Sequence, residues 1–203
     1  VTITNSSVIA TATDQTDCVS DFTLNGNDPS GFGGNGRWTV VSGSGSISSP
    51  STQYDTQVTG IPNGNTTTLQ WYVTNGTCAD SIQVSIANNN FSVNAGAPQT
   101  ICADNTVLNG DDPLTGTGYW ELVSGSGVFS NTADRNATVT GIGQGPSQYR
   151  WTVVRGGCTS SDLVNITNES PSTALITGPI DTETCFGTAT LTSNLPAPYY
   201  GDT

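Results

Sequence analysis

The stretch "LQWYVTNGTCADSIQVSI", residues 69–86, has the pattern of a β-hairpin. Leu69, Trp71 and Val73 fall on one face of an extended strand, because successive side chains point to opposite faces. An Asn-Gly dipeptide follows, which is a strong signal for a two-residue hairpin turn, and apolar and polar residues then alternate again. The stretch therefore predicts two antiparallel strands, with Cys78 at the start of the second.

The hairpin pattern occurs twice, because "LQWYVTNGTC" returns as "YRWTVVRGGC" at 149–158. Three further segments return in the same order: "TLNGNDP" (23–29) as "VLNGDDP" (107–113), "GRWTVVSGSG" (36–45) as "GYWELVSGSG" (118–127), and "TQVTGI" (56–61) as "ATVTGI" (137–142). A fixed order of similar segments is the mark of tandem repeats. The unit has about 80 residues.

Each repeat is predicted to be an all-β sandwich. Its apolar segments are short, rich in Val, Ile and Thr, and separated by Gly, Asn, Ser and Pro, and none shows helical periodicity. We expect the tryptophans to lie in the core rather than to form a platform for sugar stacking. Alternation also predicts that Trp38 and Val40 share one face of a strand.

Matches at the two ends of the sequence extend the repeat pattern. "VTITNSS" (1–7) is similar to "VNITNES" (164–170), so we expect residues 1–7 to be the last strand of a preceding repeat. The first complete repeat is then expected at 8–90 and the second at 91–170. Residues 171–203 correspond to the opening strands of a truncated third repeat. We therefore expect the chain to be a segment of a longer array.

Each repeat has one cysteine near its second strand (Cys18, Cys102) and one at its final hairpin (Cys78, Cys158). No CxxC motif or histidine completes a zinc site, so disulfides in an oxidising compartment are expected. We expect each repeat to be closed by its own bond, Cys18–Cys78 and Cys102–Cys158, which leaves Cys185 unpaired by truncation. Closing a loop of about 60 residues contributes about 4 kcal/mol in the chain-entropy model.

The charge balance excludes several classes of function. The 203 residues include 16 acidic residues, four basic ones and no histidine, for a net charge of −12. Nucleic acid binding needs a cationic surface, so nucleic acid is not an expected partner. No apolar run approaches the roughly 20 residues of a membrane span, so direct membrane insertion is not expected. The chain has no lysine or histidine, so it lacks the usual nucleophile–base systems. We expect it not to be an enzyme.

The acidic turn residues Asp28, Asp111 and Asp112 are weak candidates for calcium ligands. Asn, Asp and Gly before Pro are also the ordinary residues of tight turns, and excess acidity also keeps a repeat protein soluble. A glycosidase pair of Asp111 or Asp112 with Glu121 is disfavoured, because the first repeat has Thr39 at the position of Glu121. No catalytic residue and no cofactor other than calcium is therefore predicted.

The recurring pattern "L-N-G-[ND]-D-P … G-x-W … SGSG … V-T-G-I … W-x-V-x-x-G-x-C" resembles a known group of repeats. It is similar to the immunoglobulin-like, PKD-like repeats of very long surface proteins of Bacteroidota, including gliding-motility-associated adhesins exported by the type IX secretion system. The resemblance covers essentially the whole chain. It implies an immunoglobulin-like fold, an extracellular or cell-surface location, and a role in stalks or adhesive filaments.

Glycosylation is a further expectation for a surface protein of this kind. The tripeptide around Ser81 is similar to the Asp-Ser/Thr-aliphatic acceptor of Bacteroidota O-glycosylation. Asn-x-Ser/Thr sequons begin at Asn5, Asn65, Asn75, Asn90, Asn136, Asn165 and Asn168. A chain so rich in Asn, Ser and Thr contains most of these sequons by chance, so their number is no evidence of use.

Two functions remain open from the sequence. The first is a structural segment of a long extracellular filament or cell-surface adhesin. The alternative is a module that binds carbohydrate or another ligand, with the repeats supplying multivalency. The expected partners are neighbouring repeats of the same chain, other copies in a fibre, and surface glycans.

Overall fold

The computed structural model describes residues 8–171, 176–177 and 192–193. The chain forms two compact units, each built around one copy of the repeat. The first comprises Val1–Val93, Pro113–Thr117 and Val153–Ser161, and the second comprises Asn94–Asp112, Gly118–Thr152 and Asp162–Thr203. The described residues contain one short 3-10 helix, η1 (Pro29–Phe32), and otherwise only strands. No described helix is long and apolar enough to span a membrane.

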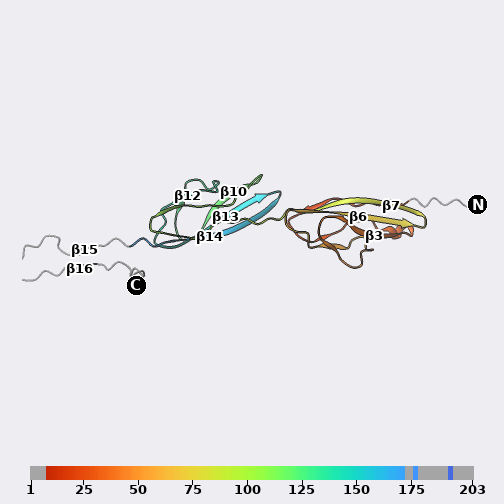
Figure 1. Cartoon of the computed structure of the whole chain (residues 1–203), viewed down its shortest axis with the longest axis horizontal. Coiled ribbons are helices and arrows are strands. Elements are labelled where there is room, and N and C mark those ends of the chain that lie inside the picture. The colour runs from red at the N-terminus through yellow and green to blue at the C-terminus, as the bar shows by residue number, and fades with distance from the viewer. Residues whose placement is uncertain (1–7, 172–175, 178–191, 194–203) are drawn as a thin grey trace, which may run out of the picture. The chain divides into compact units, whose positions relative to one another are not determined.

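The first repeat folds into two sheets (Figure 1). The larger sheet has the order β1-β7-β6-β3 and the smaller one the order β2-β5-β4. The strands are β1 (Gln15–Asp17), β2 (Phe22–Thr23), β3 (Asn35–Ser42), β4 (Ser46–Ile47), β5 (Gln57–Thr59), β6 (Asn65–Asn75) and β7 (Cys78–Asn88). Four strands facing three is the architecture of an immunoglobulin-like sandwich, as the sequence predicts.

The second repeat has the same strand order. Its sheets are β8-β14-β13-β10 and β9-β12-β11. The strands are β8 (Gln99–Ile101), β9 (Asn105–Val107), β10 (Thr117–Ser124), β11 (Val128–Phe129), β12 (Thr138–Thr140), β13 (Gly145–Arg155) and β14 (Cys158–Asn168). Beyond it, β15 (Ile176–Thr177) pairs antiparallel with β16 (Thr192–Ser193). The all-β, tandem immunoglobulin-like prediction is confirmed.

The hairpin predicted at 69–86 forms the centre of the larger sheet of the first repeat. Antiparallel pairing places Leu69 opposite Val84 and Asn75 opposite Cys78, so the register runs through to the turn. The first strand, β1, lies parallel to the end of β7 rather than antiparallel to it. The opening of the repeat is therefore fixed to the last residues of the final strand.

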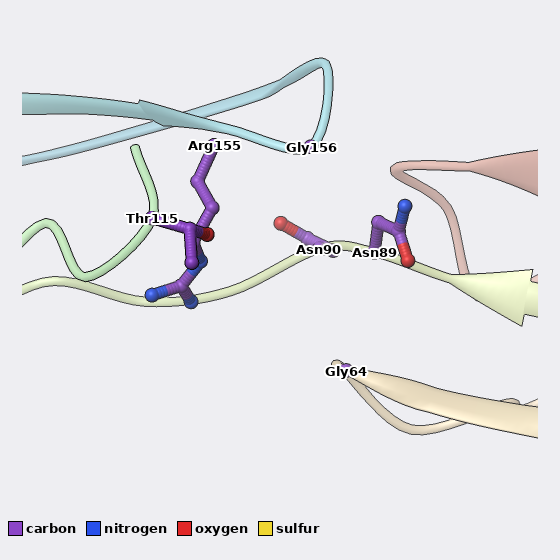
Figure 2. Close-up of a pocket in the computed structure, with 6 residues that line it drawn as sticks. All are labelled: Gly64, Asn89, Asn90, Thr115, Arg155 and Gly156. Carbon is purple, nitrogen blue, oxygen red and sulfur yellow. The ribbon is translucent and has the colours of Figure 1, made fainter. Parts of the chain in front are cut away.

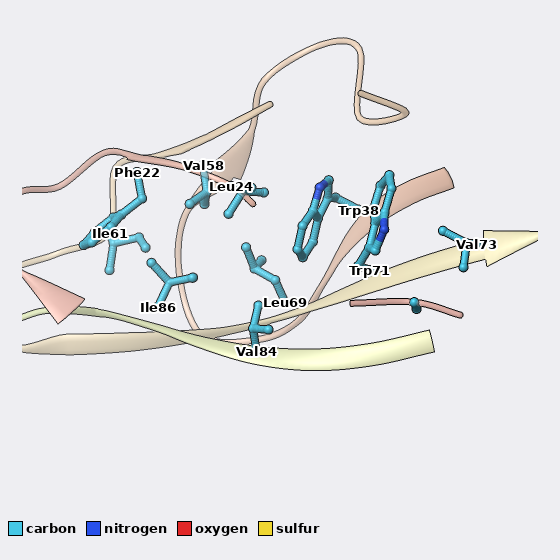
Figure 3. Close-up of a cluster of buried hydrophobic side chains, with 11 residues drawn as sticks. Phe22, Leu24, Trp38, Val58, Ile61, Leu69, Trp71, Val73, Val84 and Ile86 are labelled. Carbon is cyan, nitrogen blue, oxygen red and sulfur yellow. The ribbon is translucent and has the colours of Figure 1, made fainter. Parts of the chain in front are cut away.

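A pair of tryptophans fills the core of the first sandwich (Figure 3). The rings of Trp38 and Trp71 have their centroids 5.0 Å apart, and both side chains are buried. The Nε1 of Trp38 donates to the carbonyl of Tyr54 at 3.0 Å, and that of Trp71 donates to Asn27 Oδ1 at 3.1 Å. The indoles thus pack as apolar bodies while their N–H groups are satisfied.

The second sandwich repeats this pair with Trp120 and Trp151, whose centroids are also 5.0 Å apart. Their Nε1 groups donate to the carbonyls of Asp134 and Asp111, each at 3.1 Å. All four tryptophans are therefore core residues, as predicted.

Two glycines of the recurring motifs make room for the indole on β6. A Cβ atom built on Gly36 would lie 2.2 Å from the ring of Trp71, and one built on Gly26 would lie 2.9 Å from it. In the second repeat, a Cβ on Gly118 would lie 2.3 Å from the ring of Trp151. The Gly-x-Trp and Leu-Asn-Gly motifs therefore exist because the backbone passes directly over an indole face.

Val40 lies on the same face of β3 as Trp38, as alternation predicts, because Val40 pairs with Leu69 and Trp38 pairs with Trp71. Val40 is 40% exposed, whereas Trp38 is 1% exposed. The pairing of β3 with β6 shifts register between Val40 and Ser42. The irregularity follows directly after Val40, so Val40 is the last residue of the regular ladder and is more exposed than Trp38.

We predict that Gly36→Ala lowers the free energy of unfolding by about 1–3 kcal/mol, because the added methyl overlaps the ring of Trp71 and the packed core cannot yield freely. Gly118→Ala should act in the same direction in the second repeat. The matched control is Gly31→Ala, since nothing lies within 4 Å of its Cβ position. Urea unfolding followed by tryptophan fluorescence measures the difference, and equal midpoints for Gly36→Ala and Gly31→Ala would contradict it.

Candidate functional site: the Cys18–Cys158 disulfide

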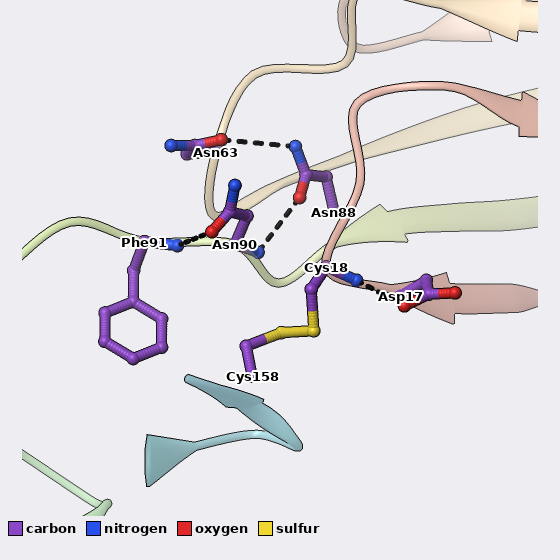
Figure 4. The surroundings of a disulfide bond; sticks show 7 residues. All are labelled: Asp17, Cys18, Asn63, Asn88, Asn90, Phe91 and Cys158. Atoms are coloured by element: carbon purple, nitrogen blue, oxygen red, sulfur yellow. Dashed lines mark hydrogen bonds between the residues drawn. A yellow bond between two sulfur atoms is a disulfide. The ribbon is translucent and has the colours of Figure 1, made fainter. Parts of the chain in front are cut away.

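The structure has one disulfide among its described residues, and it joins Cys18 to Cys158 (Figure 4). Both residues belong to the first unit, and their Cα atoms are 5.6 Å apart. Cys78 and Cys102 are exposed free thiols. The predicted pairs Cys18–Cys78 and Cys102–Cys158 are therefore wrong, and Cys185 lies outside the described residues.

The physical reason is the length of the last strand. Cys18 directly follows Asp17, which pairs with Asn88 at the end of β7, whereas Cys78 is the first residue of that strand. An extended strand rises about 3.3 Å per residue, so the two cysteines lie about 33 Å apart. A disulfide needs Cα atoms within about 7 Å.

The same argument excludes the pair predicted for the second repeat. Ile101, the residue before Cys102, pairs with Asn168 at the end of β14. Cys158 is the first residue of β14. These cysteines are again separated by the length of a strand.

Hydrogen bonds to Asp17 hold the backbone at Cys18. The backbone N–H of Cys18 donates to Asp17 Oδ1 at 2.7 Å. The N–H of Asn89 donates to the carbonyl of Asp17 at 2.8 Å. The cysteine is therefore presented from a fixed backbone at the end of β1.

A buried asparagine beside the bond orders the segment that leaves β7. The Nδ2 of Asn88 donates to the carbonyl of Ile61 at 2.8 Å, and its Oδ1 accepts from the N–H of Asn90 at 2.9 Å. Asn90 Oδ1 in turn accepts from the N–H of Phe91 (Figure 4). A fully satisfied buried amide rigidifies the backbone around it.

Cys158 comes from the tip of the hairpin formed by β13 and β14. Gly156 and Gly157 both have positive φ, +58° and +82°, as two-residue hairpin turns require. The guanidinium of Arg155 lies 4.2 Å from the centroid of the Phe91 ring, close enough for a cation–π contact. The tip is thus held by a covalent bond and by a ring contact within the first unit.

An open hollow lies beside this tip in the first unit (Figure 2). It is lined by Gly64, Asn89, Asn90, Thr115, Arg155 and Gly156. Its lining carries one charged side chain and no carboxylate.

The calcium candidate Asp28 serves as the N-cap of η1. Its Oδ1 accepts from the N–H of Ser30 at 2.8 Å, and this backbone bond, together with the Ser30 side chain, lowers the pKa of the carboxyl. The ionised form therefore adds stability above the ordinary value of 3.8, and this is lost as the pH falls through the lowered pKa. The turn interpretation describes what this residue does here.

The other acidic candidates also take part in local interactions. Asp111 Oδ2 accepts from the N–H of Asn94 at 2.8 Å, and Asp112 has a partner as well. Glu121 lies 3.8 Å from Arg150, with both side chains partly exposed. Among the described residues, no three His, Cys, Asp or Glu side chains are grouped as metal ligands would be. Calcium binding stays a prediction.

The glycosylation candidates differ in how exposed their side chains are. Ser81, Asn65, Asn136 and Asn165 are exposed, and Asn75 and Asn90 are half-buried. Asn168 is 4% exposed, and its Nδ2 donates to the carbonyl of Ile142 at 2.8 Å. A glycan on that nitrogen would break a buried hydrogen bond, so the structure argues against this candidate. Asn5 lies outside the described residues, and the remaining sites stay predictions.

Sequence reasoning missed the groups that build the site, namely Asp17, the buried Asn88 and the Arg155–Phe91 contact. The asparagine could have been found, because Asn88 and Asn168 end equivalent strands and both follow an Ile-x dipeptide. The ring contact has no such signal, since Asn75 stands at the position of Arg155 in the first repeat.

In the comparisons with known proteins, similarity to this chain was found only among solved structures. No family model and no curated protein matches the chain. A SusE-like surface-located polysaccharide-binding protein from the Bacteroides thetaiotaomicron heparin utilisation locus is 14% identical, with a TM-score of 0.37, over 79% of this chain and 34% of that one. The chain therefore spans about a third of that protein.

Two animal proteins of tandem immunoglobulin domains are similar to the same degree. The I67–I69 fragment of the titin I-band is 9% identical, with a TM-score of 0.40, over 92% of this chain and 75% of that one. The insect immune protein hemolin is 7% identical, with a TM-score of 0.47, over 79% and 46%. The immunoglobulin-like assignment therefore rests on the strand order of this chain itself.

We predict that peptide mapping of the monomeric chain without reductant recovers one peptide pair containing Cys18 and Cys158, and that a maleimide labels Cys78 and Cys102 in the folded monomer. The reason is the strand length that separates the cysteines within each repeat. Cys18→Ser should make Cys158 reactive, while Cys78→Ser should leave the Cys18–Cys158 peptide unchanged. Recovery of Cys18–Cys78 would contradict the structure.

Proposed function

We propose that the chain is a load-bearing segment of a long extracellular filament or cell-surface adhesin, built from tandem sandwiches and without catalytic activity. The observation that carries this proposal is the position of the disulfide. Cys18 and Cys158 are 140 residues apart in the sequence, and the segment between them includes most of both repeats. A pulling force applied to the ends of the chain would pass through the bond, so the segment between the two cysteines could not be extended while the bond is intact.

The proposed location is the cell surface or the extracellular space. A disulfide persists in an oxidising environment, and the acidic, lysine-free composition suits a soluble surface protein. The resemblance of the recurring motif to repeats of Bacteroidota surface adhesins supports the same location. Surface glycans and junction-stiffening calcium remain part of the proposal.

We predict that stretching the oxidised chain from its ends releases far less length than stretching the reduced chain. At about 3.5 Å per residue, the residues outside the loop give about 220 Å, and the full chain gives about 700 Å. The Cys18→Ser, Cys158→Ser double variant should reach the longer extension without reductant, and Cys78→Ser should behave as the parent. Single-molecule force spectroscopy measures this. Equal extensions for the oxidised parent and the double variant would contradict a load-bearing bond.

The alternative, a carbohydrate-binding module acting by multivalency, needs the same site in both repeats. Tyr72 is a partly exposed aromatic residue on the large sheet of the first repeat, opposite Arg37. The equivalent positions in the second repeat carry Thr152 and Tyr119. An aromatic and a charged group that pair in one copy are thus not kept together in the other, which favours the structural role.

We predict that the oxidised chain shows no saturable binding in a glycan-array screen, because the pair of Tyr72 with Arg37 in the first repeat is not kept in the second. The control is Tyr72→Ala, which should give the same background signal as the parent. Saturable binding that is lost in Tyr72→Ala would instead support the carbohydrate-binding alternative.

A further inference from the structure

The free thiol of Cys102 occupies the same backbone position as the bonded Cys18. Strands β1 and β8 pair in parallel with the ends of β7 and β14, and in the same register. In both repeats, the residue before the cysteine accepts a backbone N–H at 2.8 Å, from Asn89 to Asp17 and from Glu169 to Ile101. The second repeat therefore presents its cysteine as the first one does.

The buried asparagine network beside the bond is also repeated. Asn88 and Asn168 each donate from Nδ2 to a backbone carbonyl at 2.8 Å, and each accepts a backbone N–H at Oδ1 at 2.9 Å. The segment that leaves β14 is therefore ordered in the same way as the segment that leaves β7. The surroundings of Cys102 are formed without a bonded partner among the described residues.

The free thiol of Cys78 likewise occupies the position of the bonded Cys158. The two hairpins have strands of 11 residues joined by two residues, and each cysteine is the first residue of its second strand. Gly76 and Gly156 begin the two turns with φ of +59° and +58°. Cys158 is 2% exposed in its bond, whereas Cys78 is exposed.

We propose that Cys78 and Cys102 are the two unused halves of the Cys18–Cys158 bond, and that they link copies of this repeat covalently. The hairpin thiol Cys78 of one copy pairs with the thiol Cys102, after the opening strand, of a second copy of the chain. The bond is directional, because a hairpin cysteine meets an opening-strand cysteine and not its own equivalent. Repeated, it joins copies in head-to-tail order.

The chemistry is a two-electron oxidation. Two S–H bonds break and one S–S bond forms between Cys78 and Cys102. A small-molecule disulfide such as oxidised glutathione accepts the two electrons and the two protons, and it leaves as two thiols. The reaction proceeds through a mixed disulfide that the second protein thiol attacks.

This link rests on the shared backbone positions and not on the cation–π contact. Asn75 and Pro171 stand where the bonded pair has Arg155 and Phe91. The inference adds a covalent connection between copies to the proposed load-bearing role. The link between copies is tested separately from the load-bearing role, because the stretching experiment concerns only Cys18 and Cys158.

The test uses the full chain carrying Cys185→Ser, incubated with oxidised and reduced glutathione and analysed by non-reducing electrophoresis and peptide mapping. We expect a ladder of oligomers in which the intermolecular peptide is Cys78–Cys102, with Cys18–Cys158 intact in every species. Random oxidation would instead give the mixed bond and the two symmetric bonds in about equal total amounts.

Two single variants make the direction of the link visible. In the same background, Cys78→Ser alone and Cys102→Ser alone should each stay monomeric. Mixed together, they should form dimers that grow no further, because each copy keeps one complementary thiol. Monomers in the parent, symmetric dimers of either variant alone, or exchange that opens Cys18–Cys158 would overturn the proposal. Monomers in the parent and symmetric dimers of a variant would leave the extension expected for the oxidised chain under force unchanged, whereas opening of Cys18–Cys158 would also lengthen it.

Discussion

The close approach of glycine backbone to a buried indole is the constraint on which each sandwich depends. Trp71 packs against Trp38 on one side, and the backbone at Gly36 and Gly26 leaves no space for a Cβ atom. The indole N–H must also reach Asn27 Oδ1, so the turn after Leu24 cannot shift without leaving a buried donor unpaired. Packing and hydrogen bonding therefore fix one turn and two strands, β3 and β6, through one side chain.

The two repeats have equivalent backbone positions whose hydrogen bonds are made by different side chains. The carbonyl of Ser44 accepts the hydroxyl of Thr67 in the first repeat, and the equivalent carbonyl of Ser126 accepts the hydroxyl of Tyr149 in the second. Burial raises the pKa of Tyr149, so the phenol stays a neutral donor, and this contribution to stability is lost only as the pH rises through the raised pKa. Different residues thus satisfy the same loop carbonyl.

Local pattern predicted the strands, the hairpins and the buried tryptophans, because alternation and turn residues act over a few positions. It failed at the cysteines, where pairing depends on the order of strands in the sheet. The sequence placed Cys78 after a turn and Cys18 near an opening strand. It could not show that β1 runs parallel to the far end of β7. The boundary between repeats near residue 90 stays a prediction.

The observed disulfide is not the arrangement that would stabilise the folded chain most. In the chain-entropy model, a bond that closes a loop of about 60 residues within one repeat would contribute about 4 kcal/mol, or about 8 kcal/mol for two such bonds. The single Cys18–Cys158 bond encloses 140 residues, but because loop entropy grows only with the logarithm of length, it contributes about 5 kcal/mol. Two local bonds would therefore stabilise the folded chain more. What the observed bond adds is a covalent path from Cys18 to Cys158 that bypasses β2 to β13, whereas β1 and the body of β14 lie outside the closed loop.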